Sequence, residues 1–182
     1  MSTNPSPSIL LRDAVEQDAG AIAQLHADSW RSAYREFLSK DYLDHRVLSE
    51  RCAVWRQRFS DRVHNPFFAI LAEIGGQLGG FACVFPSENA IYGSFLDNLH
   101  VTPNRVGQGI GQRLMREVAR RLLAEKIGGG FYLWVIERNS RARRFYANAG
   151  GIEVERADLT MADGSRVTEI RCHWPDPAIL LR

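Results

Sequence analysis

A glycine-rich segment, residues 102–111, joins a predicted strand to an amphipathic helix. Residues 94–101 are largely apolar and predict the strand. Beyond the glycines, apolar residues recur at every fourth position, opposite a charged side: Ile110, Leu114, Val118 and Leu122. That spacing places an apolar stripe along a helix, which we expect to end before Gly128. The chain is therefore predicted to contain a strand–loop–helix unit.

The remaining pattern predicts further strands and helices on both sides of this unit. Strands are predicted at residues 9–12, 67–73, 78–85, 131–136, 152–160 and 166–174, and helices at 49–60 and 139–150, with a helix beginning within 13–18 and short helices or turns across 29–43. Turn signals at residues 75–77 and 163–164 make two of these strand pairs hairpins. The order predicts an α/β (α+β) fold with a single mixed, mostly antiparallel sheet flanked by helices. We expect one domain over residues 9–182 and a disordered tail at residues 1–8.

The composition is that of an ordinary globular protein and argues against several classes of partner. Hydrophobic residues make up 45% and charged residues 24%, and a net charge of +2 is too small to indicate nucleic acid or a membrane surface. No run approaches the ~18 apolar residues of a membrane-spanning helix, and the N-terminus lacks the features of a signal peptide, so we expect a cytoplasmic protein. A cluster of arginines is interpreted as a solvated helix face: Arg138, Arg141, Arg143 and Arg144.

The cysteines argue against a disulfide framework and a zinc site. Cys52, Cys83 and Cys172 are odd in number, form no CxxC pair and have no histidine cluster beside them. We expect free thiols in a reducing compartment, and no metal.

The glycine-rich segment has the properties of an anion-binding loop. Gly107, Gly109 and Gly111 allow sharp backbone turns and let a ligand approach without meeting a Cβ atom. The first amides of the following helix have no partner within the helix, and they carry the positive end of its dipole. We therefore predict that this loop binds a phosphate or pyrophosphate.

Two common phosphate-binding motifs fit this loop poorly. A Walker A loop requires a lysine after the last glycine, and none lies between Gly107 and Gln112. A dinucleotide fingerprint requires a glycine where this chain has Gln112, or Leu114 in the other register, and five residues separate Val101 from the first glycine. Glu137, at the end of the next strand, mimics the ribose-binding acid of that fold and keeps a dinucleotide-binding enzyme as an alternative.

Two motifs resemble the acetyl-CoA-binding motifs of the GNAT N-acetyltransferase superfamily. They are Val101-x-Pro103-x-x-Val106-Gly-x-Gly-Ile-Gly111 and, downstream, Asn139-x-x-Ala142-x-x-Phe145-Tyr146-x-x-x-Gly150. Residues 9–25 and the pattern of Trp30, Tyr34 and Tyr42 resemble one bacterial branch, so the likeness covers nearly the whole chain. The resemblance implies a GNAT-like fold and acetyl-CoA as co-substrate. It also implies transfer of an acetyl group to a primary amine of a small molecule or peptide, by direct attack in a ternary complex.

The resemblance implies which residues hold acetyl-CoA. Main-chain groups of residues 99–101 would pair with the pantetheine arm, and the amides of residues 107–112 would bind the pyrophosphate. Asn139 would hydrogen-bond the cofactor, and Tyr146 would lie near its sulfur. The predicted cofactor-binding residues are Leu99, His100, Val101, Val106, Gly107, Gln108, Gly109, Ile110, Gly111, Gln112, Asn139 and Tyr146. The family usually has Gln or Arg where this chain has Val106, so a side-chain contact to phosphate there is left open.

Transfer to an amine requires a group that removes a proton, because an amine with a pKa of ~10.4 is about 0.04% neutral at pH 7. Asp97 is the carboxylate best placed in the sequence for this role, directly or through a water, with a solvated or ligand-orienting role as the alternative. His100 either shares the role or is structural. The resemblance implies that the amide of Leu99, near a bulge, meets the oxyanion. Tyr146 is predicted to donate a hydrogen bond to the leaving thiolate, since full proton transfer from a phenol would cost about 2 kcal/mol.

Aromatic residues near the N-terminus are candidates for the acceptor site. Trp30, Tyr34 and Tyr42 are hypothesised to wall it, and core packing is the alternative. The acceptor class stays open among peptide N-termini, lysines, polyamines, aminoglycosides and small amino acids, as does homodimerisation. A CoA-binding module without catalysis is the competing function of a different class.

Overall fold

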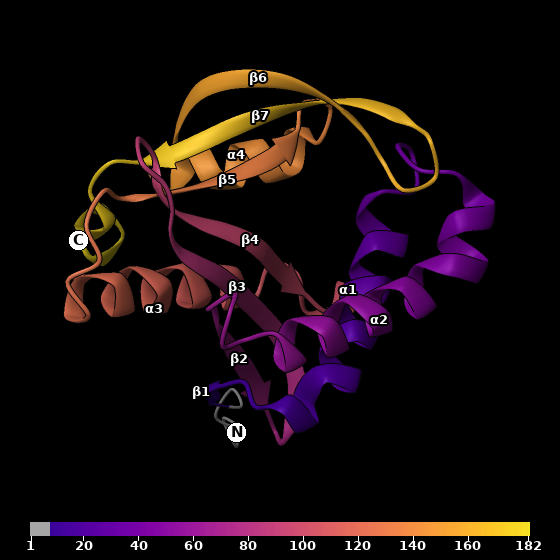
Figure 1. Cartoon of the computed structure of the whole chain (residues 1–182), viewed down its shortest axis with the longest axis horizontal. Coiled ribbons are helices and arrows are strands. Elements are labelled where there is room, and N and C mark those ends of the chain that lie inside the picture. Colours follow the sequence, from indigo (N-terminus) through magenta and orange to yellow (C-terminus); the bar gives the residue numbers. More distant parts are fainter. Residues whose placement is uncertain (1–7) are drawn as a thin grey trace, which may run out of the picture.

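The protein is built around one seven-stranded sheet in the strand order β1-β2-β3-β4-β5-β7-β6. The computed structural model describes residues 8–182, so the tail predicted at residues 1–8 lies almost wholly outside the described residues. The strands are β1 (Ile9–Asp13), β2 (Phe68–Ile74), β3 (Gln77–Asn89), β4 (Gly93–Val101), β5 (Phe131–Ile136), β6 (Ile152–Thr160) and β7 (Arg166–Trp174). Figure 1 shows helices on both faces of this sheet. The predicted mixed, mostly antiparallel sheet is confirmed.

Four α-helices and several short helical turns connect the strands. The helices are α1 (Ala19–Ala33), α2 (Val47–Ser60), α3 (Ile110–Ala124) and α4 (Ser140–Asn148). The short turns are Glu16–Asp18, Tyr42–Arg46, Pro103–Arg105 and Pro177–Leu181. α3 is long and strongly amphipathic, and its apolar stripe is buried as the four-residue spacing predicts: Ile110, Leu114, Val118 and Leu122.

The two faces of the sheet bury separate hydrophobic cores. One core joins the buried face of α3 to strands β2–β5 and β7, and Phe145 and Tyr146 of α4 pack against it. The other core joins α1 and α2 to β2 and β3 and is centred on the buried Trp55. Figure 1 shows the same division, with α1 and α2 on the opposite side of the sheet from α3. Two separately filled faces are what an α/β sheet requires, because each face is apolar.

The centre of the sheet contains its only parallel pair among the described residues. β4 and β5 are joined through α3 and pair at only two positions, Ser94 with Phe131 and Phe95 with Tyr132. At their start the chains approach closely, since a Cβ atom on Gly93 would lie 2.3 Å from the carbonyl oxygen of Gly130. From there towards Val101, β4 is paired with β3 alone. The two strands therefore diverge in the middle of the sheet.

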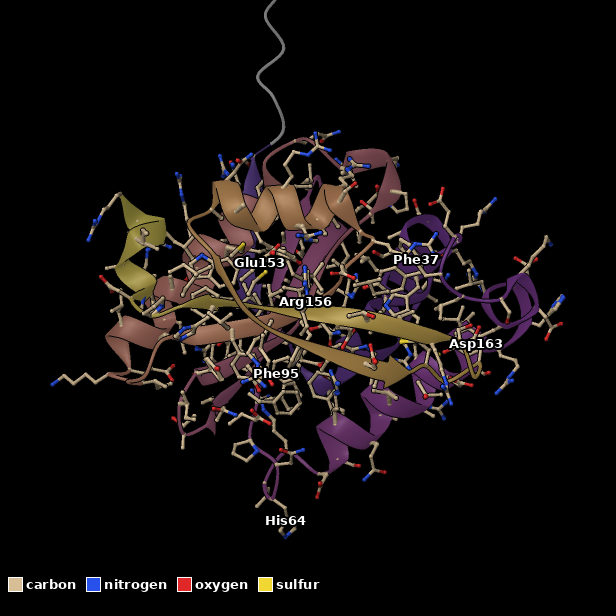
Figure 2. All side chains as sticks on the ribbon, turned by 90° about the horizontal axis from the view of Figure 1, so that it is seen from above. Phe37, His64, Phe95, Glu153, Arg156 and Asp163 are labelled. Carbon is tan, nitrogen blue, oxygen red and sulfur yellow. The ribbon has the colours of Figure 1, made fainter. Side chains whose placement is uncertain are left out.

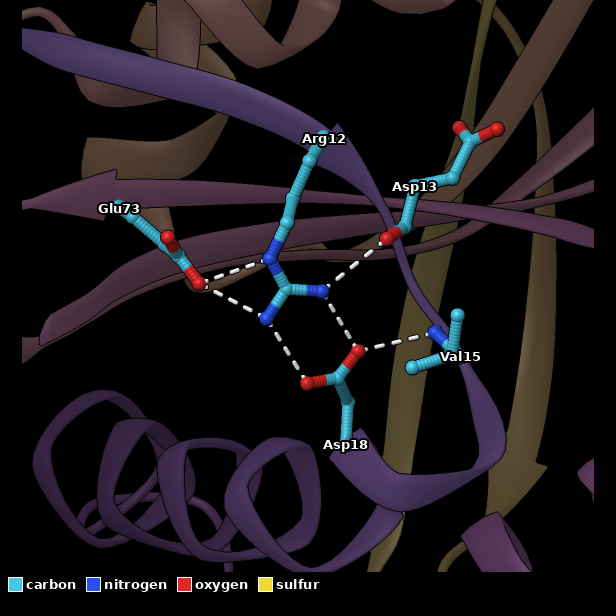
Figure 3. A network of polar contacts seen from close by, with 5 residues as sticks. All are labelled: Arg12, Asp13, Val15, Asp18 and Glu73. Carbon is cyan, nitrogen blue, oxygen red and sulfur yellow. Dashed lines mark hydrogen bonds and ion pairs between the residues drawn. The ribbon is translucent and has the colours of Figure 1, made fainter. Parts of the chain in front are cut away.

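A partly buried ion network at the β1 edge of the sheet connects the first strand to the start of the first helix. The Arg12 guanidinium donates to both oxygens of Asp18 at 2.7 and 2.8 Å, and its Nε donates to Glu73 at 2.8 Å. Asp18 also accepts from the amide of Val15 at 2.9 Å. Figure 3 shows these contacts linking β1, the start of α1 and β2. Charge-assisted bonds are stronger than neutral ones, so this network ties the start of α1 to β1 and β2.

The β6–β7 hairpin reaches from the far edge of the sheet to the segment between α1 and α2. The carboxylate of Asp163, at the hairpin tip, accepts a hydrogen bond from the amide of Ser39 at 2.6 Å. Figure 2 places Asp163 beside that segment. The hairpin thus connects two parts of the chain that are 124 residues apart.

Most predicted elements are confirmed, and the differences occur at their ends. The bounds of β5, β6 and β7 agree with the sequence, whereas β3 continues four residues further, to Asn89, and α2 begins two residues earlier, at Val47. The short helix Pro177–Leu181 was not expected. It follows Asp176, whose side chain caps it by accepting from the amide of Ala178.

Candidate active site

A β-bulge at Asp97 sets which side chains of β4 face each helix layer. β3 pairs Cys83 with Asn98 and Val84 with Leu96, so Asp97 is the extra residue. Because the bulge shifts the alternation, Leu96 and Leu99 both reach the core under α3. The side chains of Asp97 and His100 then both face α1 and α2. The bulge lies two residues before the position at which it was expected.

The glycine-rich loop presents unpaired amides at the start of α3. Gly107 and Gly109 have positive φ angles of 89° and 78°, and a Cβ atom at either position would meet nothing within 4 Å. Among residues 8–182, no acceptor faces the amides of Gly109, Ile110, Gly111 and Gln112, while Arg113 begins the helical bonding by donating to Gly109. Positive φ and open space fit an anion held by main-chain N–H groups.

Gly111 and Val106 stand at the two ends of the glycine-rich part of this loop. Gly111 lies under α4, where an added Cβ atom would be 3.2 Å from the Phe145 ring, so its small size allows α3 and α4 to pack. Val106 is 43% exposed at the loop surface. Its side chain has no polar group to offer a phosphate, so any contact of Val106 with a phosphate would come from the main chain.

Tyr146 is held rigidly on α4. Its ring meets Trp174 edge-on with centroids 6.0 Å apart, and the indole of Trp174 donates to the carbonyl of Ala149 at 2.9 Å. Burial raises the pKa of Tyr146, and the neighbouring Tyr34 raises it further. At neutral pH the phenol is therefore a hydrogen-bond donor rather than an anion.

Asn139 caps α4 by accepting from the amide of Ala142 at 3.1 Å. This role satisfies one of the otherwise unpaired amides of the helix. The cap uses only the side-chain oxygen, so the amide nitrogen keeps two N–H donors for the predicted cofactor contact.

Tyr34, at the end of α1, has a pKa that two carboxylates affect. Burial raises the pKa of Tyr34 to about 12, with further contributions from the charges of Glu169 and Asp97. Tyr34 in turn raises the pKa of Tyr146. Charged or ionisable side chains of α1, β4, α4 and β7 therefore affect one another's pKa values.

Asp97 is paired with an arginine from α2. Its Oδ2 lies 2.6 Å from a terminal nitrogen of Arg58, and a second nitrogen of Arg58 donates to Asn98 at 2.8 Å. The Asp97 and Arg58 side chains are 20% and 18% exposed. That oxygen is ion-paired with Arg58 but is buried and accepts no hydrogen bond among residues 8–182.

His100 is neutral and a weak base. Its Nδ1 shares a hydrogen bond of 2.9 Å with Ser29, and its ring lies 4.5 Å from that of His26. Burial, with a smaller effect of Arg51, lowers the pKa of His100 to about 3. A base this weak contributes little to deprotonating an amine, so the structure favours the structural role for this side chain.

Glu169 is a carboxylate that the sequence analysis missed. It lies on β7 opposite Ile136, the last residue of β5. Burial raises its pKa, and in the described part of the chain its side chain forms no hydrogen bond or ion pair. The alternation of β7 contained the signal, because Ile170 and Cys172 face the α3 core and so place Glu169 and Arg171 on the other side.

The three aromatic residues of the hypothesised acceptor wall differ. Tyr42 is 1% exposed and its hydroxyl donates to Glu50 at 2.8 Å, so it belongs to the core and does not line a site. Trp30 and Tyr34 are half-buried, with ring centroids 5.3 Å apart. These two remain candidates for contact with an acceptor.

Other observations bear on the alternatives. Glu137, the residue that kept a dinucleotide in consideration, forms an ion pair with Arg156 at 3.0 Å. All three cysteines are free thiols, as expected. In the described residues, no helix has the length and apolar character needed to cross a membrane. Surface hollows along the β6–β7 hairpin and between β1 and α3 contain none of the predicted site residues.

Known proteins with similar sequences are acetyltransferases. The model of the acetyltransferase (GNAT) family matches residues 22–150. A Bacillus subtilis protein described as the uncharacterized N-acetyltransferase YuaI is 30% identical over 174 residues, covering 94% of this chain and 96% of that protein. A Sus scrofa thialysine N-epsilon-acetyltransferase is 29% identical over 168 residues, covering 86% and 89%.

Solved structures show the same fold. The PaiA N-acetyltransferase of Thermoplasma acidophilum, solved in complex with coenzyme A, has a TM-score of 0.72 and 20% identity, covering 92% of this chain and 99% of that one. Arabidopsis thaliana NAA60, in complex with a bisubstrate analogue, has a TM-score of 0.67 and 19% identity, covering 92% and 97%. The family match over most of the chain and the similar sequences agree, and membership of an acetyltransferase family favours acetyl-CoA over a dinucleotide. The chain belongs to the GNAT family and is an N-acetyltransferase.

Proposed function

We propose that the protein transfers an acetyl group from acetyl-CoA to a primary amine of a small molecule or peptide, by direct attack in a ternary complex. The observation that carries this proposal is the row of acceptor-free amides at the start of α3, beside the stretch of β4 that β5 leaves unpaired. Such amides fit a diphosphate. The unpaired edge of β4 fits an extended amide-bearing arm.

Separate groups of described residues would hold the different parts of acetyl-CoA. Amides of residues 107–112 would hold the diphosphate, and the open space at Gly107 and Gly109 leaves room for it. Main-chain groups of residues 99–101 would bind the pantetheine arm. Asn139 would add a side-chain donor. When bound, acetyl-CoA supplies the activated acyl group and a thiolate leaving group.

Two donor groups of the chain would then act on the reaction. The hydroxyl of Tyr146 would donate a hydrogen bond to the sulfur, a role that its raised pKa supports by keeping the phenol protonated. The amide of Leu99, two residues after the bulge, would donate to the acyl oxygen. These donors are fixed before the substrates bind, so they need no rearrangement during the reaction.

Glu169 is the proposed acceptor of the amine's proton. Its carboxylate has no partner in residues 8–182, and its raised pKa makes it a stronger base than an exposed glutamate. Asp97, predicted from the sequence, stays the competing candidate, with Arg58 holding one of its oxygens. In our proposal Asp97 orients the acceptor, and substitution of each carboxylate separates the two roles.

The acceptor is proposed to bind between α1 and β7, near Trp30 and Tyr34. A homologue named for thialysine N-epsilon acetylation supports an amino-acid side-chain amine among the acceptors to test. The test is a screen for acetyl-CoA-dependent thiol release with amino acids, peptides, polyamines and aminoglycosides. Release with one class supports the proposal, and release with none, despite saturating acetyl-CoA, contradicts it. Acetyl-CoA but not NAD should also raise the unfolding temperature.

A further inference from the structure

Arg51, on α2, has a guanidinium group that forms no ion pair with a carboxylate in the described part of the chain. Its Cζ atom lies 4.6 Å from the centre of the Trp30 ring, so the guanidinium stacks on the indole. Its Nε is buried and has no hydrogen-bond partner among residues 8–182. A buried N–H group without an acceptor is destabilising, and native proteins usually satisfy it with a ligand, a water or a side chain.

His26 presents a second buried donor beside the same ring. The indole of Trp55 donates to His26 Nδ1 at 3.2 Å, so the proton of the neutral imidazole is on Nε2. Nε2 is buried, and residues 8–182 provide no partner for it. The His26 and Trp30 rings meet edge-on with centroids 5.2 Å apart. Two unsatisfied donors, from α1 and α2, therefore flank Trp30.

These donors lie on the side of the sheet where the acceptor is proposed to bind. Trp30 contacts Tyr34, and the charges of Glu169 and Asp97 raise the pKa of Tyr34. Arg51 helps to lower the pKa of His100, a residue of the β4 stretch that is proposed to bind the cofactor arm. The guanidinium is thus close to the reacting end of the site.

The carboxylate next to Arg51 in sequence is already engaged. Glu50 accepts from the Tyr42 hydroxyl at 2.8 Å and from Arg46 at 3.3 Å. It satisfies those two groups and leaves the Arg51 guanidinium to another anion. A carboxylate matches the planar donor fork of a guanidinium and would also accept from an adjacent imidazole N–H.

We propose that Arg51 binds a carboxylate of the acceptor, so the acceptor is an amino acid with a free carboxyl group rather than a polyamine. This inference rests on the proposed function and names the substrate class of the same site. The cationic Arg51 faces one end of the acceptor and the unpaired carboxylate Glu169 the other, which suits a zwitterion. A polyamine would bring a second cation towards Arg51, and like charges in a partly buried site repel.

The test compares acceptors that differ only in the carboxyl group. Thialysine, its carboxamide and the diamine without the carboxyl group are assayed with saturating acetyl-CoA. We expect wild-type kcat/KM to be at least about tenfold higher for thialysine than for its carboxamide, the lower end for a hydrogen-bonded ion pair. Arg51→Gln should remove this preference by raising KM for thialysine, and should lower kcat/KM for the carboxamide far less than for thialysine. Arg51→Lys keeps the charge and should retain part of the preference.

Arg56→Gln is the matched control. Arg56 lies on the same helix, is exposed and donates to the carbonyl of Cys52. Arg56→Gln should leave the ratio of kcat/KM for thialysine and its carboxamide at the wild-type value. The inference is overturned if wild type shows no preference, or if Arg51→Gln lowers kcat/KM equally for thialysine and carboxamide, as a purely structural role would.

A binding measurement separates this inference from the proposed function. If none of the three amines is acetylated while acetyl-CoA binds, the proposed function fails for this class. Thermal unfolding then tests Arg51 alone. Thialysine should raise the unfolding temperature of wild type more than its carboxamide does, and Arg51→Gln should remove the difference. Equal shifts in wild type would overturn the inference.

Discussion

The carboxylate of Asp97 and the guanidinium of Arg58 form an ion pair of 2.6 Å between β4 and α2. The bulge at Asp97 makes this contact possible, because it turns the side chain towards α2 while Leu96 and Leu99 stay under α3. Arg58 also stacks over Trp55 at 4.9 Å. The pair therefore links the proposed active strand to the core of the α1–α2 layer.

Asp97→Asn should lower the stability of the protein through loss of the ion pair with Arg58, and should have only a small effect on kcat. Loss of the charge leaves Arg58 with a neutral partner, and we expect destabilisation of about 1–3 kcal/mol, as for a buried polar group that loses its partner. If Asp97 orients the acceptor, kcat should fall by less than about tenfold. Denaturant unfolding and steady-state kinetics measure the two effects. A larger loss of kcat with unchanged stability would instead make Asp97 the base.

Glu169→Gln should lower kcat by about 100-fold or more, because it removes the proposed proton acceptor. Burial raises the pKa of Glu169, so the wild-type rate should fall as the pH drops through that raised value, and the variant should lose this limb. A carboxyl group with a raised folded pKa stabilises the fold at low pH and loses that contribution as the pH rises. The variant should therefore unfold at a higher temperature than wild type at pH 7. Unchanged kcat would remove Glu169 from the mechanism.

Tyr146→Phe should lower kcat about 100-fold while stability changes little. The ring contacts with Trp174 and Phe145 do not involve the hydroxyl, so the variant keeps them. Single-turnover kinetics would assign the loss to the chemical step. A variant with wild-type kcat would show that the hydroxyl has no part in departure of the thiolate.

His100→Asn tests the neutral state of the buried imidazole. Because burial lowers the pKa of His100 to about 3, the unfolded chain binds a proton that the folded chain does not, between that value and the ordinary 6.5. The contribution of the neutral His100 side chain to the stability of the fold is present above pH 6.5 and is lost as the pH falls from 6.5 towards 3. Unfolding temperatures from pH 7 to pH 4 should fall less steeply for the variant than for wild type. Parallel slopes would mean that the imidazole is charged in the folded state.

The sequence predicted the sheet, its order of elements and the glycine-rich loop before α3 because those features depend on local periodicity and on glycine positions. Phe131–Ile136 is a continuous apolar strand, and Gly109 has the positive φ that its place before α3 requires. The roles of side chains on β4 and β7 were harder to predict, since they depend on a bulge and on strand pairing. Glu169 lies 72 positions from Asp97 in sequence, and only the path of β7 across the sheet places both near Tyr34.

The same reason explains why the sequence left two roles open for Tyr42 and gave no indication of Arg51. Both lie in the α1–α2 segment, whose aromatic spacing fits a core and a binding wall equally well. Tyr42 turns inward to Glu50, while Arg51 stacks on Trp30 with a buried donor left unsatisfied in residues 8–182. Periodicity assigns a residue to a face of a helix and does not identify its partners.

A crystal structure of the protein with bound coenzyme A would test the central claim most directly. We expect diphosphate oxygens within about 2.7–3.2 Å of the main-chain amides in residues 107–112. We also expect the pantetheine arm along residues 99–101, with its sulfur near the hydroxyl of Tyr146. A diphosphate bound elsewhere on the molecule, with these amides still unoccupied, would contradict the account.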